Sequence, residues 1–159
     1  MRRFCFGVVL LSFIAALLLF PAVQASKQEA SGSFYPTSPY PVYYEESLVG
    51  DNLIIKAGWP FAQTGTFSGN VFVEQTIVVE LDTGKTQGED VTTFTGTIAG
   101  ESGSYNGFHE WTIVDGFAVG KWKIISGTVG SATLEGEGTF VTDSVTGLGT
   151  YAGYIEVND

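Results

Sequence analysis

The sequence has very little of the chemistry that disulfide frameworks and most metal sites require. Its 159 residues include one cysteine and one histidine. A single cysteine excludes an intrachain disulfide and every zinc site built from several cysteines, and a single histidine excludes the common multi-histidine sites. Carboxylates alone can bind calcium, but solvated turns and strand faces explain the acidic groups Asp82-Thr83-Gly84, Glu89-Asp90 and Glu135/Glu137 more simply. We therefore predict no bound metal and no cofactor.

Basic residues are also scarce. Seven Lys and Arg stand against 17 Asp and Glu, which gives a formal net charge of −10. A face that binds nucleic acid needs clustered Lys and Arg, so nucleic acid is excluded as the default partner. The acidic balance favours solubility and disfavours contact with anionic surfaces.

The first 25 residues have the order of a secretory signal peptide. Two arginines precede an apolar run from Phe4 to Phe20, Pro21 ends that run, and Val23-Gln24-Ala25 offers small residues where signal peptidase cleaves. The alternative is an uncleaved anchor, because the run is near the lower limit for spanning a bilayer, about 17 residues. We expect cleavage after Ala25, and hence a secreted or extracytoplasmic protein with no membrane contact after cleavage.

The mature chain would keep 159 − 25 = 134 residues, without cysteine or arginine. That length suits one domain with one core. We expect an N-terminal strand and a Pro- and Tyr-rich loop over residues 26–52, and a β-barrel over 53–159 that forms a single domain with 30–52. The segment Ser38–Ser47 is expected to be an irregular, partly extended loop, whose tyrosines cover a sheet edge or a cavity mouth.

From Leu53 onward the chain alternates apolar and polar residues, and no stretch has helical spacing. Turn residues at Gly69-Asn70, Asp82–Lys85 and Asp115-Gly116 predict short hairpins, which join antiparallel neighbours. An eighth strand is expected near Ser33–Tyr35 or Thr64–Phe67. The seven main strands are expected near Leu53–Trp59, Val71–Leu81, Val91–Ile98, Gly103–Val114, Phe117–Ile125, Ala132–Val141 and Gly149–Val157.

Glycines recur on the strand positions expected to face inward, where glycine is costly. In a small closed barrel they leave room for large rings such as Trp111 and Trp122. We therefore predict an all-β fold, a small closed antiparallel barrel of about eight strands rather than a sandwich. The inward glycines are Gly107, Gly120, Gly136, Gly138, Gly149 and Gly153.

Several motifs resemble a known family. Gly103–Tyr105 leads to Phe108-His109, then to Gly120–Thr128 and Leu134–Phe140, and Ala30–Phe34 resembles an opening strand. This order is similar to the bacterial domain-of-unknown-function family DUF3224, which pairs a G-S-F…Q-H segment with G-x-W-x-V-V-x-G-S-G and L-x-G-x-G. The resemblance covers most of the mature chain.

The chain departs from that family at two positions, since Phe108 stands where the family often has Gln and Trp111 where it has a small residue. The resemblance implies a calycin-like barrel, with the barrels of allene oxide cyclase and the dirigent proteins as distant relatives. Those barrels enclose an apolar cavity and steer the cyclisation or coupling of a bound small molecule. Fold alone does not assign function.

The candidate catalytic residues are His109 and Tyr105. Histidine is the one side chain that ordinarily titrates near neutrality, so His109 could act as a general base in an apolar cavity; the alternative is a histidine bonded to a strand carbonyl. Gln75 lies on an apolar strand face and could orient a ligand carbonyl, and the tryptophans could stack on a ligand ring or simply pack the core. The candidate ligand-binding residues are Gln75, Phe94, Trp111, Trp122 and Tyr151.

Three functions are consistent with these features. The first is a secreted barrel that binds a small apolar molecule. The second is an isomerase or cyclase of the allene oxide cyclase type, which would hold its substrate in one conformation while His109 or Tyr105 moves a proton. The third is a structural or cell-surface interaction module with a packed core. A cavity that reaches His109 and Trp122 would favour the first two, and the oligomeric state is left open.

Overall fold

The structure, a computed structural model, describes residues 26–158, and these residues form one antiparallel sheet. The signal peptide predicted for residues 1–25, with Cys5, lies outside the described residues. Within the described part there is no helix long and apolar enough to cross a membrane. The nine strands of residues 26–158 are β1 (Ser26–Pro36), β2 (Tyr43–Val49), β3 (Asn52–Gly65), β4 (Phe67–Glu80), β5 (Thr86–Ile98), β6 (Glu101–Val114), β7 (Phe117–Val129), β8 (Ala132–Asp143) and β9 (Gly149–Asn158).

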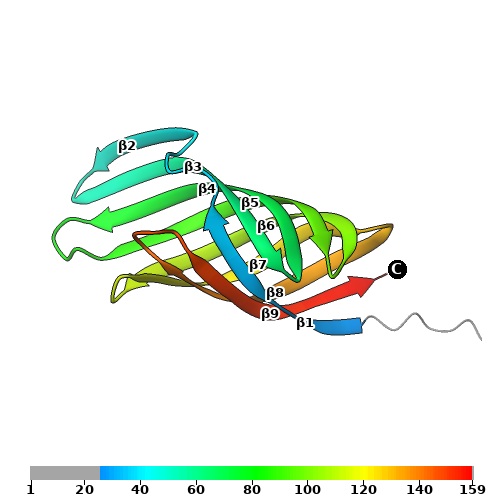
Figure 1. Ribbon diagram of the computed structural model, residues 1–159. Helices are drawn as coiled ribbons and strands as arrows, with labels where there is room; N and C mark the ends of the chain where they lie inside the picture. The colour runs from blue at the N-terminus through cyan, green and yellow to red at the C-terminus, as the bar shows by residue number, and fades with distance from the viewer. Residues whose placement is uncertain (1–25, 159) are drawn as a thin grey trace, which may run out of the picture.

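Eight of these strands close into a hydrogen-bonded ring (Figure 1). Neighbours in the chain pair from β3 to β9, β9 pairs with β1, and β1 pairs with β3 to complete the circle. The predicted antiparallel, barrel-like fold of about eight strands is therefore confirmed. The ninth strand, β2, stands outside the ring and pairs with β3.

Strand β3 has two different partners along its length. Its first half, from Asn52 to Gly58, pairs with β2, and its last residues, from Phe61 to Gly65, pair with β1. Strands β1 and β2 therefore follow one another along the same edge of β3. Figure 1 shows β2 diverging from β9, so the wall is closed at one end of the ring and flares open at the other.

At the flared end, the structure corrects part of the loop expected over Ser38–Ser47. Residues 38–42 are irregular, as expected, but Tyr43 to Ser47 belong to β2. Both prolines, Pro39 and Pro41, precede the strand, so every paired position of β2 keeps its N–H donor. All seven residues of β2 are exposed.

The predicted hairpin turns meet different outcomes. Asp115-Gly116 joins β6 to β7 with positive φ at both residues, which suits a tight turn, and residues 81–85, which include the predicted turn residues, join β4 to β5. The turn predicted at Gly69-Asn70 is wrong, because both residues lie inside β4 and the chain turns at Gly65-Thr66. Gly69 instead allows β4 and β5 to lie close together, because a Cβ at this position would collide with the carbonyl oxygen of Thr95.

The closed end of the ring holds the core. Alternate residues of the ring strands point inward, and the inward sets predicted for β6, β7 and β8 are confirmed. The ring of Trp122 lies so close to Gly138 and Gly153 that a Cβ on either glycine would meet it at 2.7 and 2.6 Å. Those inward glycines therefore make room for aromatic rings, as expected. The largest fully buried side chains are Phe67, Thr92, Phe94, Ile98 and Ile155.

Candidate functional site

The open end of the barrel contains a cavity of about 1020 Å³. Its lining residues extend from the flared wall of β3 and β4 to the aromatic side chains at mid-barrel. All three tryptophans of the chain, Trp59, Trp111 and Trp122, line it. The volume is just above the range of about 300–1,000 Å³ that is usual for small-molecule sites. Its apolar lining includes Phe34, Ile55, Ala57, Phe61, Phe67, Val71, Val73, Ile77, Val79, Ile113, Ala118 and Phe140.

Aromatic rings form the floor of the cavity. The Phe67 ring lies 5.2 Å from Tyr105, 5.8 Å from Trp122 and 5.3 Å from Tyr151, measured between centroids. These separations are typical of favourable edge-to-face and tilted pairs. The floor separates the cavity from the packed core beneath it.

The two tyrosine hydroxyls of the floor already have partners. Tyr105 donates to Gln63 Oε1 at 3.2 Å, while Tyr151 accepts from the Phe67 amide at 2.9 Å and donates to the Thr64 carbonyl at 3.1 Å. Burial raises the pKa of both tyrosines. A tyrosine with a raised pKa and an occupied hydroxyl is a weak proton shuttle near neutrality, so these features favour a packing role for both residues.

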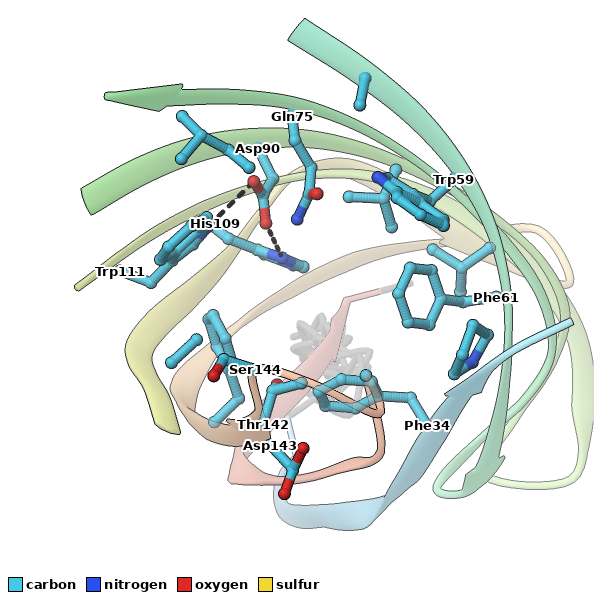
Figure 2. Close-up of a pocket in the computed structure, with 18 of the residues that line it drawn as sticks. Phe34, Trp59, Phe61, Gln75, Asp90, His109, Trp111, Thr142, Asp143 and Ser144 are labelled. Carbon is cyan, nitrogen blue, oxygen red and sulfur yellow. Dashed lines mark hydrogen bonds and ion pairs between the residues drawn. The ribbon is translucent and has the colours of Figure 1, made fainter. Parts of the chain in front are cut away.

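A short row of polar side chains crosses the apolar wall. Gln75 of β4 pairs in register with Asp90 of β5, and Asp90 pairs with His109 of β6. Directly paired positions point to the same face of a sheet, and all three residues line the cavity. Figure 2 shows the three side chains converging on the cavity from neighbouring strands.

Asp90 is the centre of this row. Its side chain is 5% exposed, and its Oδ1 accepts a hydrogen bond from Trp111 Nε1 at 2.9 Å. His109 Nδ1 lies 3.7 Å from the other oxygen, Oδ2, which is beyond hydrogen-bonding distance. A buried carboxylate normally has several hydrogen-bond partners, so Oδ2 has capacity for a further donor.

His109 lies between the polar row and the floor. Its ring is 5.4 Å from the Phe140 ring and its side chain is 17% exposed. The Nδ1 atom is turned toward Asp90, which leaves the opposite edge of the imidazole, with Nε2, free of that carboxylate. This placement gives the cavity one group able to donate or accept a proton.

The β8–β9 loop forms part of the rim. Asp143 Oδ1 accepts from the amides of Val145 and Thr146 at 3.0 and 2.8 Å and from the Thr146 hydroxyl at 3.0 Å. These hydrogen bonds lower the pKa of Asp143, the backbone bond from Thr146 most strongly. Ser144 Oγ donates to the Gly116 carbonyl at 2.6 Å, which ties the rim to the β6–β7 turn.

The structure brings most of the predicted site residues to one cavity. His109 and Gln75 lie in the polar row, Trp111 donates a hydrogen bond to Asp90 of that row, and Tyr105, Trp122 and Tyr151 belong to the floor. Phe94 does not reach the cavity: it is fully buried and stacks on Tyr105 with centroids 4.9 Å apart. The predicted residues that line the cavity are Gln75, Tyr105, His109, Trp111, Trp122 and Tyr151.

Asp90 is the residue that sequence reasoning missed. The Glu89-Asp90 pair was expected on a solvated surface, which is correct for Glu89, but Asp90 is 4% exposed. The expected strand began at Val91, whereas β5 begins at Thr86. Extending the alternation of Thr92 and Phe94 backward by one step would have placed Asp90 on the inner face. Among residues 26–158, no group of three or more His, Cys, Asp or Glu side chains is placed to hold a metal ion.

Comparison with solved structures shows that the fold resembles that of a protein of unknown function. A crystal structure of a protein of unknown function from the DUF3224 family of Shewanella oneidensis MR-1 superposes with a TM-score of 0.63 at 15% identity, over 84% of this chain and 99% of that one. The resemblance to DUF3224 therefore holds at the level of the fold. No protein-family model and no curated protein matches the chain.

Proposed function

We propose that this protein is exported and binds a small apolar molecule in the open end of its barrel. The observation that carries the proposal is the cavity of about 1020 Å³, whose wall is mainly aromatic and aliphatic, with one polar row in the wall and further polar residues at the rim. Sites for small molecules have this composition, a largely apolar surface with a few convergent polar groups. A module with a fully packed core would leave no such space.

Export is supported by the order of the first 25 residues, in which a basic start, an apolar run and a small-residue cleavage site follow one another. Expression in a bacterial host followed by intact-mass measurement tests this part separately. The mature protein should begin at Ser26. Retention of residues 1–25 on the mature protein would contradict export by cleavage and favour an anchor.

Binding is tested by titrating the purified mature chain with the apolar fluorophore N-phenyl-1-naphthylamine. We expect saturable enhancement of the probe's emission with one site per chain. Quenching of the intrinsic emission should accompany it, because every tryptophan of the protein lines the cavity. The proposal would be overturned if neither this probe nor dodecylamine, 1-dodecanol or dodecanoate showed saturable binding.

A matched pair of variants locates the bound probe. Ile77 lies on the cavity wall and is partly exposed, so Ile77→Trp should fill space there and weaken binding at least tenfold. Ile125 is 64% exposed on the outer surface, so Ile125→Trp should leave the affinity unchanged. Equal effects of the two variants would place the probe outside the cavity.

A second function, isomerase or cyclase chemistry, is favoured by the placement of His109 beside Asp90 within the cavity. A carboxylate next to an imidazole orients it as a proton acceptor. The test is to incubate the mature chain with extracted lipophilic metabolites and to search for isomerised products by mass spectrometry. Loss of these products in His109→Gln, with probe binding retained, would support catalysis. Binding without any product would indicate that the protein is a carrier.

A further inference from the structure

We propose that the ligand of the cavity is a cationic amphiphile, a molecule with an apolar body and a protonated amine, and that Asp90 binds the amine. This inference rests on the proposed function, because it names the ligand class of the same site. It is carried by the partners of Asp90, by the apolar wall around it and by the charges that face the cavity.

The partners of Asp90 leave it short of hydrogen bonds. Among residues 26–158, the one hydrogen bond to its carboxylate comes from the indole of Trp111, at 2.9 Å to Oδ1. His109 Nδ1 is 3.7 Å from Oδ2. A carboxylate accepts several hydrogen bonds, so Oδ2 can accept one from a donor that approaches from the cavity. An ammonium group at the cavity wall would supply both the missing donors and a compensating charge.

The wall around Asp90 suits the rest of such a molecule. Trp111 stands directly beside the carboxylate and Trp59 faces the cavity from β3 (Figure 2). Indole faces attract organic cations as well as apolar chains. Beyond these rings the wall is aliphatic, with Ile55 and Ile77 on neighbouring strands, so an alkyl or aryl body would be buried while its amine meets the polar row.

The charges that face the cavity disfavour an anionic end group. Asp90 is buried in the wall and Asp143 lies at the rim. Lys123 also contributes to the cavity lining, but the residue is exposed and its strand position alternates with the inward Trp122 and Ile124. A carboxylate ligand placed beside Asp90 would bring two like charges together in a poorly solvated site, which is repulsive.

The test compares three ligands of equal chain length, dodecylamine, 1-dodecanol and dodecanoate, as competitors of the fluorescent probe at neutral pH and below their aggregation limits. The amine should compete best, the alcohol should follow, and the carboxylate should be weakest. A charge-assisted hydrogen bond supports a preference of roughly 10- to 100-fold for the amine over the alcohol.

Two variants attribute this preference to Asp90. Asp90→Asn keeps an oxygen that accepts from Trp111 but removes the charge, so the amine should lose its advantage while the alcohol binds as before. Glu89→Gln removes one charge from the exposed neighbour on the same strand, and it should leave the order of the ligands unchanged. The ratio of the affinities for amine and alcohol is measured on the unmodified protein. A folding defect in Asp90→Asn would therefore leave this test intact.

The outcomes separate the two proposals. If all three alkyl ligands and the probe fail to bind, the proposed function itself fails. If they bind but the carboxylate competes as well as or better than the amine, the cation assignment fails and the apolar cavity stands. The cation assignment also fails if Glu89→Gln abolishes the preference as fully as Asp90→Asn, because the selectivity would then come from the overall charge.

Discussion

The two ends of the barrel are built from the same alternating strands, yet one is packed and the other hollow. At the closed end Phe94, Ile98 and Ile155 are fully buried. At the open end, inward residues of neighbouring strands, such as Ile77 of β4 and Trp111 of β6, remain partly exposed around the cavity. The residue types are similar, so hydrophobicity alone does not explain the difference.

The difference lies in where the ring closes. Strand β1 pairs with the last residues of β3, from Phe61 to Gly65, and the first half of β3 pairs with β2 instead. Side chains from all eight strands meet below that closure and fill the interior. Above it β2 flares outward, so the inward residues of β3 and β4 have no opposite wall to pack against. The change of partner of β3 from β1 to β2 therefore leaves a cavity at the end of the core.

The largest expected contrast is in stability. Phe94→Ala removes a fully buried ring from the closed end and should cost about 3–5 kcal/mol in the free energy of unfolding. Ile77→Ala removes atoms that already face the cavity and should cost about 1 kcal/mol or less. Urea denaturation of both variants measures the contrast, and equal losses would break the distinction between a packed and a hollow end.

A second contrast concerns the glycines that let the wall close around the aromatic floor. A Cβ at Gly138 would collide with the Ala152 carbonyl and meet the Trp122 ring. Gly138→Ala should therefore cost about 1–3 kcal/mol in unfolding free energy through overpacking. Thr139→Ala, at the next and exposed position, should stay within about 0.5 kcal/mol. A neutral Gly138→Ala would show that the wall is less tight than the structure indicates.

The polar row sharpens the comparison from the open end. Trp111→Phe deletes the donor to Asp90 and leaves the buried carboxylate without its hydrogen bond, at a cost of about 1–2 kcal/mol in unfolding free energy. Trp59→Phe, on the opposite part of the cavity wall, is the control and should cost less. Thermal unfolding of the two variants under identical conditions decides between them, and a reversed order would remove Asp90 from the centre of the site.

The smallest effect should come from the rim. Hydrogen bonds from Thr146 and Val145 lower the pKa of Asp143, so the stabilisation of this loop is present above the ordinary carboxyl pKa and is lost as the pH falls through the lowered value. Amide exchange at Val145 and Thr146 should therefore gain protection between acid and neutral pH, beyond the intrinsic rate change. Asp143→Ala should abolish that gain, while Asp143→Asn, which keeps the acceptor oxygen, should retain protection at both pH values.

Much of this architecture could be predicted from the sequence because strand periodicity is a local signal. The alternation of β6 to β8 gave the inward faces, and glycine at Gly138 and Gly153 indicated large rings opposite them. Strand ends and partners were harder. The glycine of Gly69-Asn70 suits a turn and a close strand contact equally well, and only the position of Thr95 across the sheet decides between them.

The candidate site could be predicted only in part, for the same reason. His109 and Trp111 stood out by residue type, whereas Asp90 looks like any acidic strand residue until its strand is extended to Thr86. Phe94 and Trp111 are both inward aromatic residues. Phe94 is buried in the core and Trp111 lines the cavity, because they lie on different sides of the ring closure. That closure is a pairing between residues about thirty positions apart in the chain, such as Gly32 and Gly65.

The central claim, that the open end binds a ligand, is tested most directly by a nuclear magnetic resonance titration of the nitrogen-15-labelled mature chain with dodecylamine. The indole N–H signals of Trp59 and Trp111 should shift in a saturable manner, and the backbone amides of Phe94 and Ile155 in the closed end should stay in place. Shifts confined to the exposed strand β2, or none at either indole, would contradict the account.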